Sequence, residues 1–504
     1  MKRRTVLKLI GAPTAAALLG TGGWRTALGA PDSFRIAASR PRGGPPTLTE
    51  TIAALVNRAR FEELPAEVVQ KAKELLVFSF ANGLEGVHGE QGGQIDAIAP
   101  LLSQPRTGGA SVIGRRYRLS VSDASFANCS VLRADKGHDD VLFPAAVHTS
   151  PLIIPPALAL AEVNKLAGRD VILAIVLGYE VVGKLGRAAD GWKAAMPRRP
   201  TTIYGAYGPV TVAGRLLKLS DNQLANAYGY GANIGIGVPE GSFVDHFYSF
   251  IAGNSVLAAQ LAAAGGAAYA RTTLEGEHGL YQSFFGEVPQ ALASLVAAFG
   301  SNWEILNAEP NTFSTTGHIT VAISLMQSIL REQSLTSERI DHIEAVLPYA
   351  NYADARLEAL ASQGPFTRMM DVTSSLPFAF ALITLLARTN VDPRDWYDQH
   401  DTLDSVNDPT VLRMAKRVSL KFEENRGNLR YARVEVITEG GQRFRKEATR
   451  LDTSIPRGDW KNWLARGSSA VSQTQLDSLE RLIADLENVP DASALMAAAT
   501  PQMM

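Results

Sequence analysis

Side chains that can move protons are grouped in two short stretches of this 504-residue sequence. In the first stretch, Asp139 and Asp140 are followed by His148 in a loop rich in Pro and Ala. In the second, residues 245–248 supply a carboxylate, an imidazole and a phenol. Histidine changes its charge most readily near neutral pH, so His148 is a candidate general acid or base. Its spacing alone favours a structural role.

The two neighbouring aspartates are expected to have separate roles. Adjacent residues direct their side chains apart, so Asp139 and Asp140 cannot both face one reacting group. One of them is expected to orient His148 or to accept from a backbone N–H, while the other faces the cleft. The alternative is that both belong to a solvated loop or a helix cap.

The metal-binding and nucleotide-binding patterns are incomplete. Cys129 is the one cysteine, so the chain can form neither an intramolecular disulfide nor a cysteine metal cluster. Histidines and aspartates occur together in residues 138–148, but without a tight ligand spacing such as His-Glu-x-x-His. The glycines of residues 229–235 miss the spacing of a dinucleotide-binding loop. We therefore expect no metal and no nucleotide cofactor.

The overall charge argues against a nucleic-acid partner. The chain has 49 Lys and Arg against 50 Asp and Glu, a formal net charge of -1. A protein that binds phosphate backbones needs a basic face, and no such excess is present. A small anionic substrate would have to be bound by local positive charge inside a pocket.

The N-terminal segment has the order of an export signal. Arg3 and Arg4 precede a moderately apolar run over residues 9–19, and small residues follow up to Ala30. We expect a twin-arginine-type signal peptide over residues 1–30, a linker over residues 31–47 and a periplasmic or secreted protein with no membrane span after removal of the signal. The alternative is an uncleaved basic tail on a cytoplasmic protein.

Hydrophobic periodicity then predicts the elements that hold these residues. Apolar residues recur at helical spacing from residue 48 to about 304 and again after Pro456. Between these regions, residues 418–422 and 434–444 alternate like strands, with a hairpin turn at Gly440-Gly441. The expected fold is mainly α with an α+β part. Both chain ends, residues 48–304 and 456–504, form a large all-helical domain, and residues 305–455 form a smaller α+β lid domain.

A series of motifs in the same order resembles the MmgE/PrpD family of 2-methylcitrate dehydratase and cis-aconitate decarboxylase-like proteins. The motifs are LPAEVVQKAKEL at 64–75, HDDV at 138–141, HTSP at 148–151, PPALALAE at 155–162, GYEV at 178–181, RPT at 199–201, LEG at 274–276 and SSLPF at 374–378. The resemblance implies a homodimer with its active site in a cleft between the two domains. It also implies cofactor-free elimination, decarboxylation or isomerisation of small polycarboxylates, and it favours a catalytic role for His148.

Some residues depart from the family pattern. Arg199 stands where the family has a histidine before Pro-Thr, and the two family lysines fall near Tyr248 and Glu309. The first aspartate of the family loop falls at Gly137, and its threonine falls at Val141. Two positive charges are therefore lost from the expected pocket.

These departures change the expected substrate. Arg199, together with Arg198, can hold one carboxylate in bidentate fashion, but a guanidinium cannot carry protons near neutral pH. Tyr248 can replace a lysine as proton donor, and Glu309 adds a negative charge. A substrate less anionic than 2-methylcitrate is expected.

The sequence thus predicts a cofactor-independent, dehydratase-like lyase that abstracts a proton alpha to a carbonyl or carboxylate of a small organic acid. The catalytic candidates are His148, Asp139, Tyr248 and Glu309. The substrate-binding candidates are Arg199, Arg198, Asp140, His246, Tyr204 and His318. One alternative is an isomerase, epimerase or decarboxylase on the same scaffold, and another is a non-catalytic exported binding protein.

Overall fold

The structure is a computed structural model of the chain. It describes residues 45–102, 108–133, 139–189, 200–235, 246–266, 271–313, 315, 317–348, 354–389, 402–423, 430–449 and 455–501. Arg198 and Arg199, like the N-terminal residues 1–44, lie outside these described residues. No described helix combines the length and the apolar composition needed to cross a lipid bilayer.

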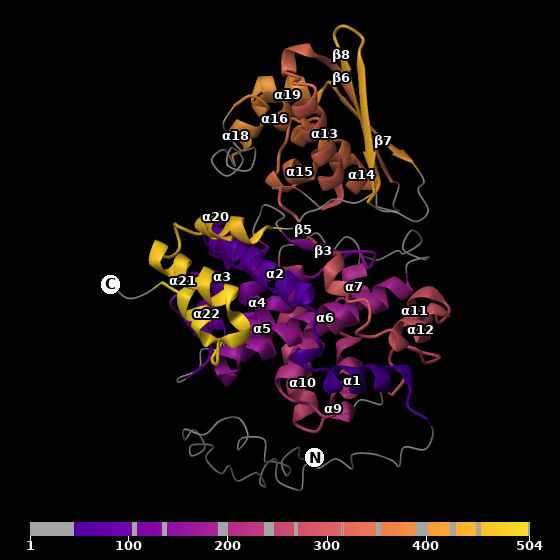
Figure 1. Cartoon of the computed structure of the whole chain (residues 1–504), viewed down its shortest axis with the longest axis vertical. Coiled ribbons are helices and arrows are strands. Elements are labelled where there is room, and N and C mark those ends of the chain that lie inside the picture. Colours follow the sequence, from indigo (N-terminus) through magenta and orange to yellow (C-terminus); the bar gives the residue numbers. More distant parts are fainter. Residues whose placement is uncertain are drawn as a thin grey trace, which may run out of the picture.

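The described residues are organised around two hydrophobic cores. The larger core gathers buried side chains between Ile52 and Ala308 and others between Ile455 and Ala499. The second core gathers buried side chains between Ile319 and Val436. Figure 1 shows the second core above the first, with the C-terminal helices in yellow beside α2. The expected fold class, mainly α with an α+β part, is confirmed.

The larger core is built from helices. They are α1 (Leu48–Arg58), α2 (Ala66–Glu85), α3 (Glu90–Ile98), α4 (Val121–Leu132), α5 (Ser150–Asn164), α6 (Gly168–Ala188), α7 (Pro200–Tyr204), α8 (Tyr207–Leu216), α9 (Asp221–Gly231), α10 (Phe247–Ala263), α11 (Leu280–Phe285), α12 (Ala291–Ala297), α20 (Trp460–Ala465), α21 (Gln473–Ala484) and α22 (Ser493–Ala498). Helices α20 and α21 contact α2, and α22 contacts α5. The C-terminal helices therefore complete a core that the N-terminal helices begin.

The helix starts follow from local sequence signals. Thr47 and Glu50 form a capping box at α1, in which each side chain accepts from the other residue's backbone N–H. Ser472 and Gln475 form the same motif at α21. Pro65 directly precedes α2, where its missing N–H costs no hydrogen bond.

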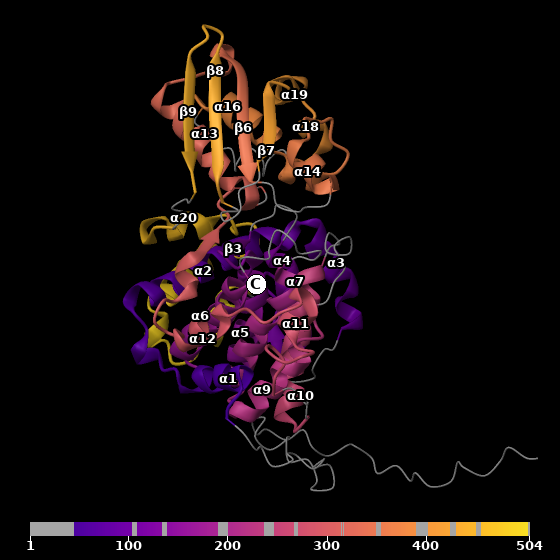
Figure 2. The ribbon, with the colours of Figure 1, turned by 90° about the vertical axis from the view of Figure 1, so that its right-hand side faces the viewer.

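The α+β part is a four-stranded sheet covered by helices on one face. Its strands are β6 (Ile340–Pro348), β7 (Val418–Glu423), β8 (Ala432–Thr438) and β9 (Arg443–Ala448), and its helices are α13 (Thr320–Glu332), α14 (Asp354–Ala361), α15 (Met369–Ser374), α16 (Leu376–Leu386), α18 (Leu403–Val406) and α19 (Pro409–Ala415). The strand order is β7-β6-β8-β9, as Figure 2 shows. The β8–β9 hairpin turns at Gly440-Gly441 as expected, whereas β7 pairs in parallel with β6.

Two smaller sheets belong to the helical side of the molecule. Strands β1 (Ala110–Ser111) and β2 (Arg118–Leu119) form one of them. The other has the order β4-β3-β5 and contains β3 (Asp140–Leu142), β4 (Val147–His148) and β5 (Ala308–Pro310). In Figure 1, β3 and β5 lie at the level where the helical part meets the α+β part.

A cluster of buried charges fixes the segment that leads into β5. Glu304 lies in the 3-10 helix η7 (Glu304–Asn307), and Lys184 of α6 lies 3.2 Å from its carboxylate. Arg187 pairs with Glu304 as well, at 2.7 Å. Glu180 accepts from the backbone N–H of Glu304 at 2.8 Å. Buried charges are stable only when paired in this way, so α6 sets the position of η7 and of the strand after it.

Candidate active site

The central feature of the β4-β3-β5 sheet is a hydrogen-bonded Asp–His pair. Asp139 lies directly before β3, and His148 is the last residue of β4. Nδ1 of His148 lies 2.9 Å from Oδ1 of Asp139. The Asp139 side chain is 3% exposed and that of His148 is 15% exposed, so only the imidazole reaches toward solvent. A carboxylate at Nδ1 fixes the proton there and leaves Nε2 as the nitrogen for proton transfer.

Strand alternation separates the two aspartates as the sequence suggested. Asp140 points to the opposite face of β3, into the helical core, where it is fully buried. Its carboxylate accepts from the backbone N–H of Ser150 at the start of α5 and from the hydroxyl of Tyr179 on α6, at 2.8 Å. Burial raises the pKa of Asp140, an effect that these hydrogen bonds oppose. The structure thus places Asp140 as a tie between β3, α5 and α6.

Tyr248 lies beside the imidazole of His148. It is the second residue of α10, and its ring meets that of His148 edge to face, with the centroids 5.5 Å apart. Tyr248 is 4% exposed, and its hydroxyl has no hydrogen-bond partner within the described part of the chain. A buried hydroxyl is normally satisfied, so an unsatisfied one next to an imidazole is a candidate for substrate contact.

Arg133 joins these groups, although the sequence did not single it out. It is the C-terminal cap of α4, and its guanidinium carbon lies 3.9 Å from the centroid of the Tyr248 ring. Its Nε lies 3.5 Å from Oδ2 of Asp139. One guanidinium therefore touches both partners of His148. The available signal was a basic residue shortly before an acidic loop, but contact with Tyr248 depends on tertiary packing.

His246 holds the start of α10 in place. Its Nε2 lies 2.5 Å from Oε1 of Gln94 on α3, and its Nδ1 lies 2.8 Å from Oγ of Ser130 on α4. Its ring stacks on Phe126, with centroids 6.0 Å apart. Both ring nitrogens are occupied, so the structure places His246 as a support for Tyr248 rather than beside a reacting atom.

Close helix packing adds to this support. A Cβ atom at Gly253 would lie 3.1 Å from the backbone oxygen of Ser122 and 3.2 Å from Cβ of Phe126. The glycine therefore lets α10 approach α4 closely. Because α10 carries Tyr248 and α4 ends at Arg133, this contact sets the distance between the two side chains.

Glu309 shares a sheet face with His148. Both residues are paired with Val141, His148 from β4 and Glu309 from β5, and directly opposed residues point to the same face. Glu309 forms an ion pair with Arg430, which lies just before β8 in the α+β part. The guanidinium carbon of Arg430 also lies 4.5 Å from the ring centroid of Phe143. This face is therefore bordered by a residue from each part of the molecule.

The chain also passes over this face where it enters the α+β part. A Cβ atom at Gly317 would lie 3.0 Å from Val141, midway between His148 and Glu309 in the sheet. Gly317 begins the 3-10 helix η8 (Gly317–Ile319), which contains His318. The backbone of His318 thus runs close to the face that carries the Asp–His pair.

The remaining candidates lie elsewhere or outside the described residues. Tyr204 is fully buried in α7 and donates to the backbone oxygen of Ala145 at 2.8 Å. It anchors the loop between β3 and β4. The arginines proposed to clamp a carboxylate, Arg198 and Arg199, belong to the undescribed segment that precedes α7.

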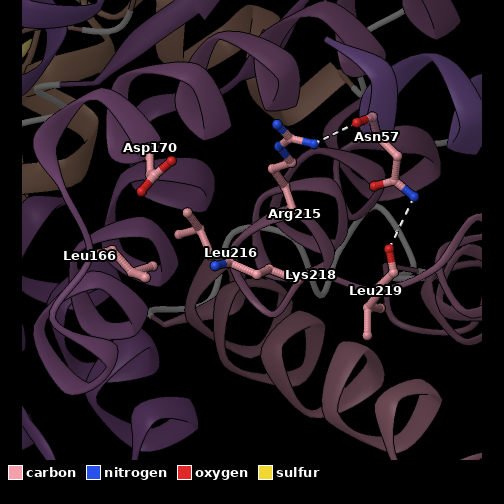
Figure 3. A pocket seen from close by; sticks show the side chains of 7 residues that line it. All are labelled: Asn57, Leu166, Asp170, Arg215, Leu216, Lys218 and Leu219. Carbon is pink, nitrogen blue, oxygen red and sulfur yellow. Dashed lines mark hydrogen bonds between the residues drawn. The ribbon is translucent and has the colours of Figure 1, made fainter. Parts of the chain in front are cut away.

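The described residues hold no group of three or more His, Cys, Asp and Glu arranged for a metal ion. A cavity of about 320 Å³ occurs elsewhere, between α1, α6 and α8. It is lined by Asn57, Leu166, Asp170, Arg215, Leu216, Lys218 and Leu219, none of them a candidate site residue (Figure 3). Arg215 donates there to the backbone oxygens of Asn57 and Ala59, so its guanidinium stabilises the C-terminal end of α1.

A helical body, a smaller α+β part and an Asp–His pair at their junction define an enzyme-like fold of two parts. Residues 50–292 match the MmgE/PrpD N-terminal domain. Residues 50–292 therefore resemble that domain, and the family resemblance expected from the sequence is confirmed.

Curated relatives match most of the chain. A protein named cis-aconitate decarboxylase from Aspergillus terreus is 21% identical over 89% of this chain and 95% of its own length. A cis-aconitate decarboxylase-like protein of Aspergillus oryzae is 23% identical over 91% of this chain and 98% of its own. The Homo sapiens protein named cis-aconitate decarboxylase is 23% identical over 89% and 94%, respectively. These similarities support an enzyme of the lyase type.

Proposed function

We propose that the protein is a cofactor-independent lyase that acts on a small organic acid by moving a proton next to a carboxylate or carbonyl group. The observation that carries this proposal is the 2.9 Å contact between Asp139 and Nδ1 of His148, with the Tyr248 ring against the same imidazole. This arrangement supplies a base whose tautomer is fixed and a second proton-bearing group beside it.

In the elimination that we propose, Nε2 of His148 takes the proton from the carbon next to the acid group. The bonding electrons move toward the carboxylate or carbonyl and then form a carbon–carbon double bond. The leaving hydroxyl takes a proton from Tyr248 and departs as water. Asp139 stabilises the imidazolium that forms, which is the role of a buried carboxylate at Nδ1.

Decarboxylation is the second candidate, because the relatives named above are cis-aconitate decarboxylases. In that reaction the bond to the carboxyl carbon breaks, CO2 leaves, and its electron pair stays on the remaining carbon. Tyr248 or protonated His148 then delivers a proton to that carbon. The same groups serve both reactions, with the proton moving in opposite directions at His148.

The charges around the site favour a substrate with few carboxylates. Among the described residues near the pair, Asp139 is matched by Arg133 and Glu309 by Arg430. These four groups leave no net positive charge to hold a tricarboxylate. We therefore propose a substrate less anionic than 2-methylcitrate, bound through Arg199 and Arg198.

The first test is turnover of a panel of small acids by the purified protein, including cis-aconitate, 2-methylcitrate and monocarboxylic hydroxy acids. Products are followed by NMR in D2O, which separates elimination, CO2 loss and simple proton exchange. In His148→Gln we expect kcat to fall by roughly 100-fold or more, because general acid–base catalysis contributes about that much.

The matched control is His342→Gln. His342 lies on β6 in the α+β part, where its Nε2 is hydrogen-bonded to Ser419 at 2.9 Å. This variant should keep wild-type turnover. Undiminished turnover by His148→Gln would overturn the proposed role of His148, and tight binding of an acid without any turnover would favour the binding-protein alternative.

A further inference from the structure

Arg133 contacts Tyr248 and Asp139 at the same time. Its guanidinium covers the face of Tyr248 at 3.9 Å and lies 3.5 Å from the carboxylate of Asp139. Both contacted residues touch the imidazole of His148 directly. The Arg133 side chain is 25% exposed, so it lies largely within the protein and is only partly screened by water.

We propose that Arg133 is a positioning residue that sets the protonation of the Asp139–His148 pair and holds the plane of Tyr248. This inference rests on the proposed function, in which His148 must be neutral to accept a proton. In this inference, Arg133 does not contact the substrate.

Charged and polar groups face His148 from several elements. Asp139 is bonded to Nδ1, Tyr248 lies against the ring, and Arg133 lies behind both. Glu309 lies on the same sheet face beyond Val141, where Arg430 offsets its charge. Asp140 faces the opposite side of the sheet. Among the described carboxylates near the ring, Asp139 is thus the one that Arg133 contacts.

A carboxylate beside an imidazole favours the protonated form, the imidazolium. An imidazolium cannot act as a base, because its ring nitrogen already carries the proton that it would have to accept. The nearby guanidinium offsets that field, keeps Asp139 ionised and disfavours a second positive charge on His148. Arg133 thus offsets the charge that Asp139 presents to the ring, while the Asp139 carboxylate still accepts from Nδ1–H of His148. Without Arg133, the pair would keep its extra proton to higher pH.

The geometry also explains why the residue is an arginine. A planar guanidinium can lie flat on an aromatic ring and direct an N–H from its edge to a carboxylate. The compact ammonium of a lysine would supply the charge without covering the ring. Replacement by lysine therefore separates the electrostatic role from the role in holding Tyr248.

The test measures the titration of His148 directly, by NMR of the full protein labelled with 15N-histidine. The His148 signals are assigned by their loss in His148→Gln. In Arg133→Gln, we expect the titration midpoint of His148 to rise by about one pH unit, because a positive charge close to the pair has been removed. In Arg133→Lys it should stay near the wild-type value.

The matched control is Arg466→Gln. Arg466 lies over Trp463, 5.0 Å from its ring centroid, and pairs with Glu85 at 2.7 Å, which reproduces both contacts away from the site. This variant should not move the His148 titration. Thermal denaturation of each variant checks that it is folded.

Turnover supplies the second readout. With an accepted substrate, the acidic limb of kcat/KM in Arg133→Gln should move to higher pH by the same amount as the NMR midpoint. Addition of guanidinium at millimolar concentration should restore part of the lost activity at neutral pH.

An unchanged His148 midpoint in folded Arg133→Gln would overturn the inference, whatever the substrate proves to be. Failure of the proposed function has a different signature. In that case His148→Gln retains activity, while the NMR midpoint still responds to Arg133.

Discussion

At the scale of single residues, some side chains of the candidate site are placed for chemistry and others have a structural role. Tyr248 and Tyr204 show the contrast, because both are buried phenols that the sequence suggested for one pocket. The hydroxyl of Tyr204 donates to the backbone oxygen of Ala145, whereas that of Tyr248 has no partner among the described residues. A buried hydroxyl without a partner costs stability, so its retention favours a role in binding or catalysis.

Substitution of each tyrosine by phenylalanine tests this contrast. Tyr248→Phe should keep or slightly raise the melting temperature, since it removes an unsatisfied group, while kcat falls by at least about 10-fold through loss of the proton donor. Tyr204→Phe should instead cost about 1–2 kcal/mol in urea unfolding, because Ala145 loses its donor. A marked loss of stability in Tyr248→Phe would show that its hydroxyl has a structural partner.

Part of the candidate site was predictable from the sequence, and the rest depends on contacts that only the fold creates. The sequence pointed to His148 and Asp139 because both belong to the family-like motifs and are residue types that can move protons. Arg430 could not be predicted as a neighbour of Glu309, because the two lie at the ends of different elements. The contact between Arg133 and Tyr248 exists only because α4 packs on α10.

At the scale of elements, local periodicity predicted the helices and the β8–β9 hairpin well. The pairing of β7 was harder to predict. Its alternating residues indicate a half-exposed strand, but nothing local specifies that β6 lies between β7 and β8. Parallel pairing joins segments far apart in the sequence, so turn residues cannot reveal it.

The contact between α6 and η7 is an element-scale feature open to test. A Cβ atom at Gly183 would lie 2.3 Å from Cβ of Glu304, which is too close for either backbone to remain in place. Gly183→Ala should therefore lower the free energy of unfolding by about 1–3 kcal/mol. It should also reduce kcat, because η7 leads directly into β5 and Glu309.

Gly93→Ala is the matched control for this prediction. Gly93 lies in α3, and a Cβ atom there would meet no atom within 4 Å. Alanine should be neutral or add up to about 1 kcal/mol of stability at this position, through its better helix propensity. Equal stabilities of the two variants in urea unfolding would contradict the proposed role of the α6–η7 contact.

At the scale of the whole molecule, the predicted export signal remains to be tested, because residues 1–44 lie outside the described residues. We propose that the protein crosses the membrane through the twin-arginine route, and the homodimer implied by the family likewise remains a prediction. Replacement of both Arg3 and Arg4 by lysine should leave the protein in the cytoplasmic fraction in its uncleaved form. Lys2→Ala should still be exported, and export of the Arg3→Lys/Arg4→Lys variant would contradict this route.

The return of the C-terminal helices to α2 has a consequence for the order of events during synthesis. Helix α2 ends at Glu85, whereas the helices that cover it, α20 and α21, begin at Trp460 and Gln473. A ribosome has therefore translated the whole α+β part before those helices emerge. The face of α2 that these helices cover is made early and covered late, so a nascent chain exposes it to chaperones for most of the period of elongation.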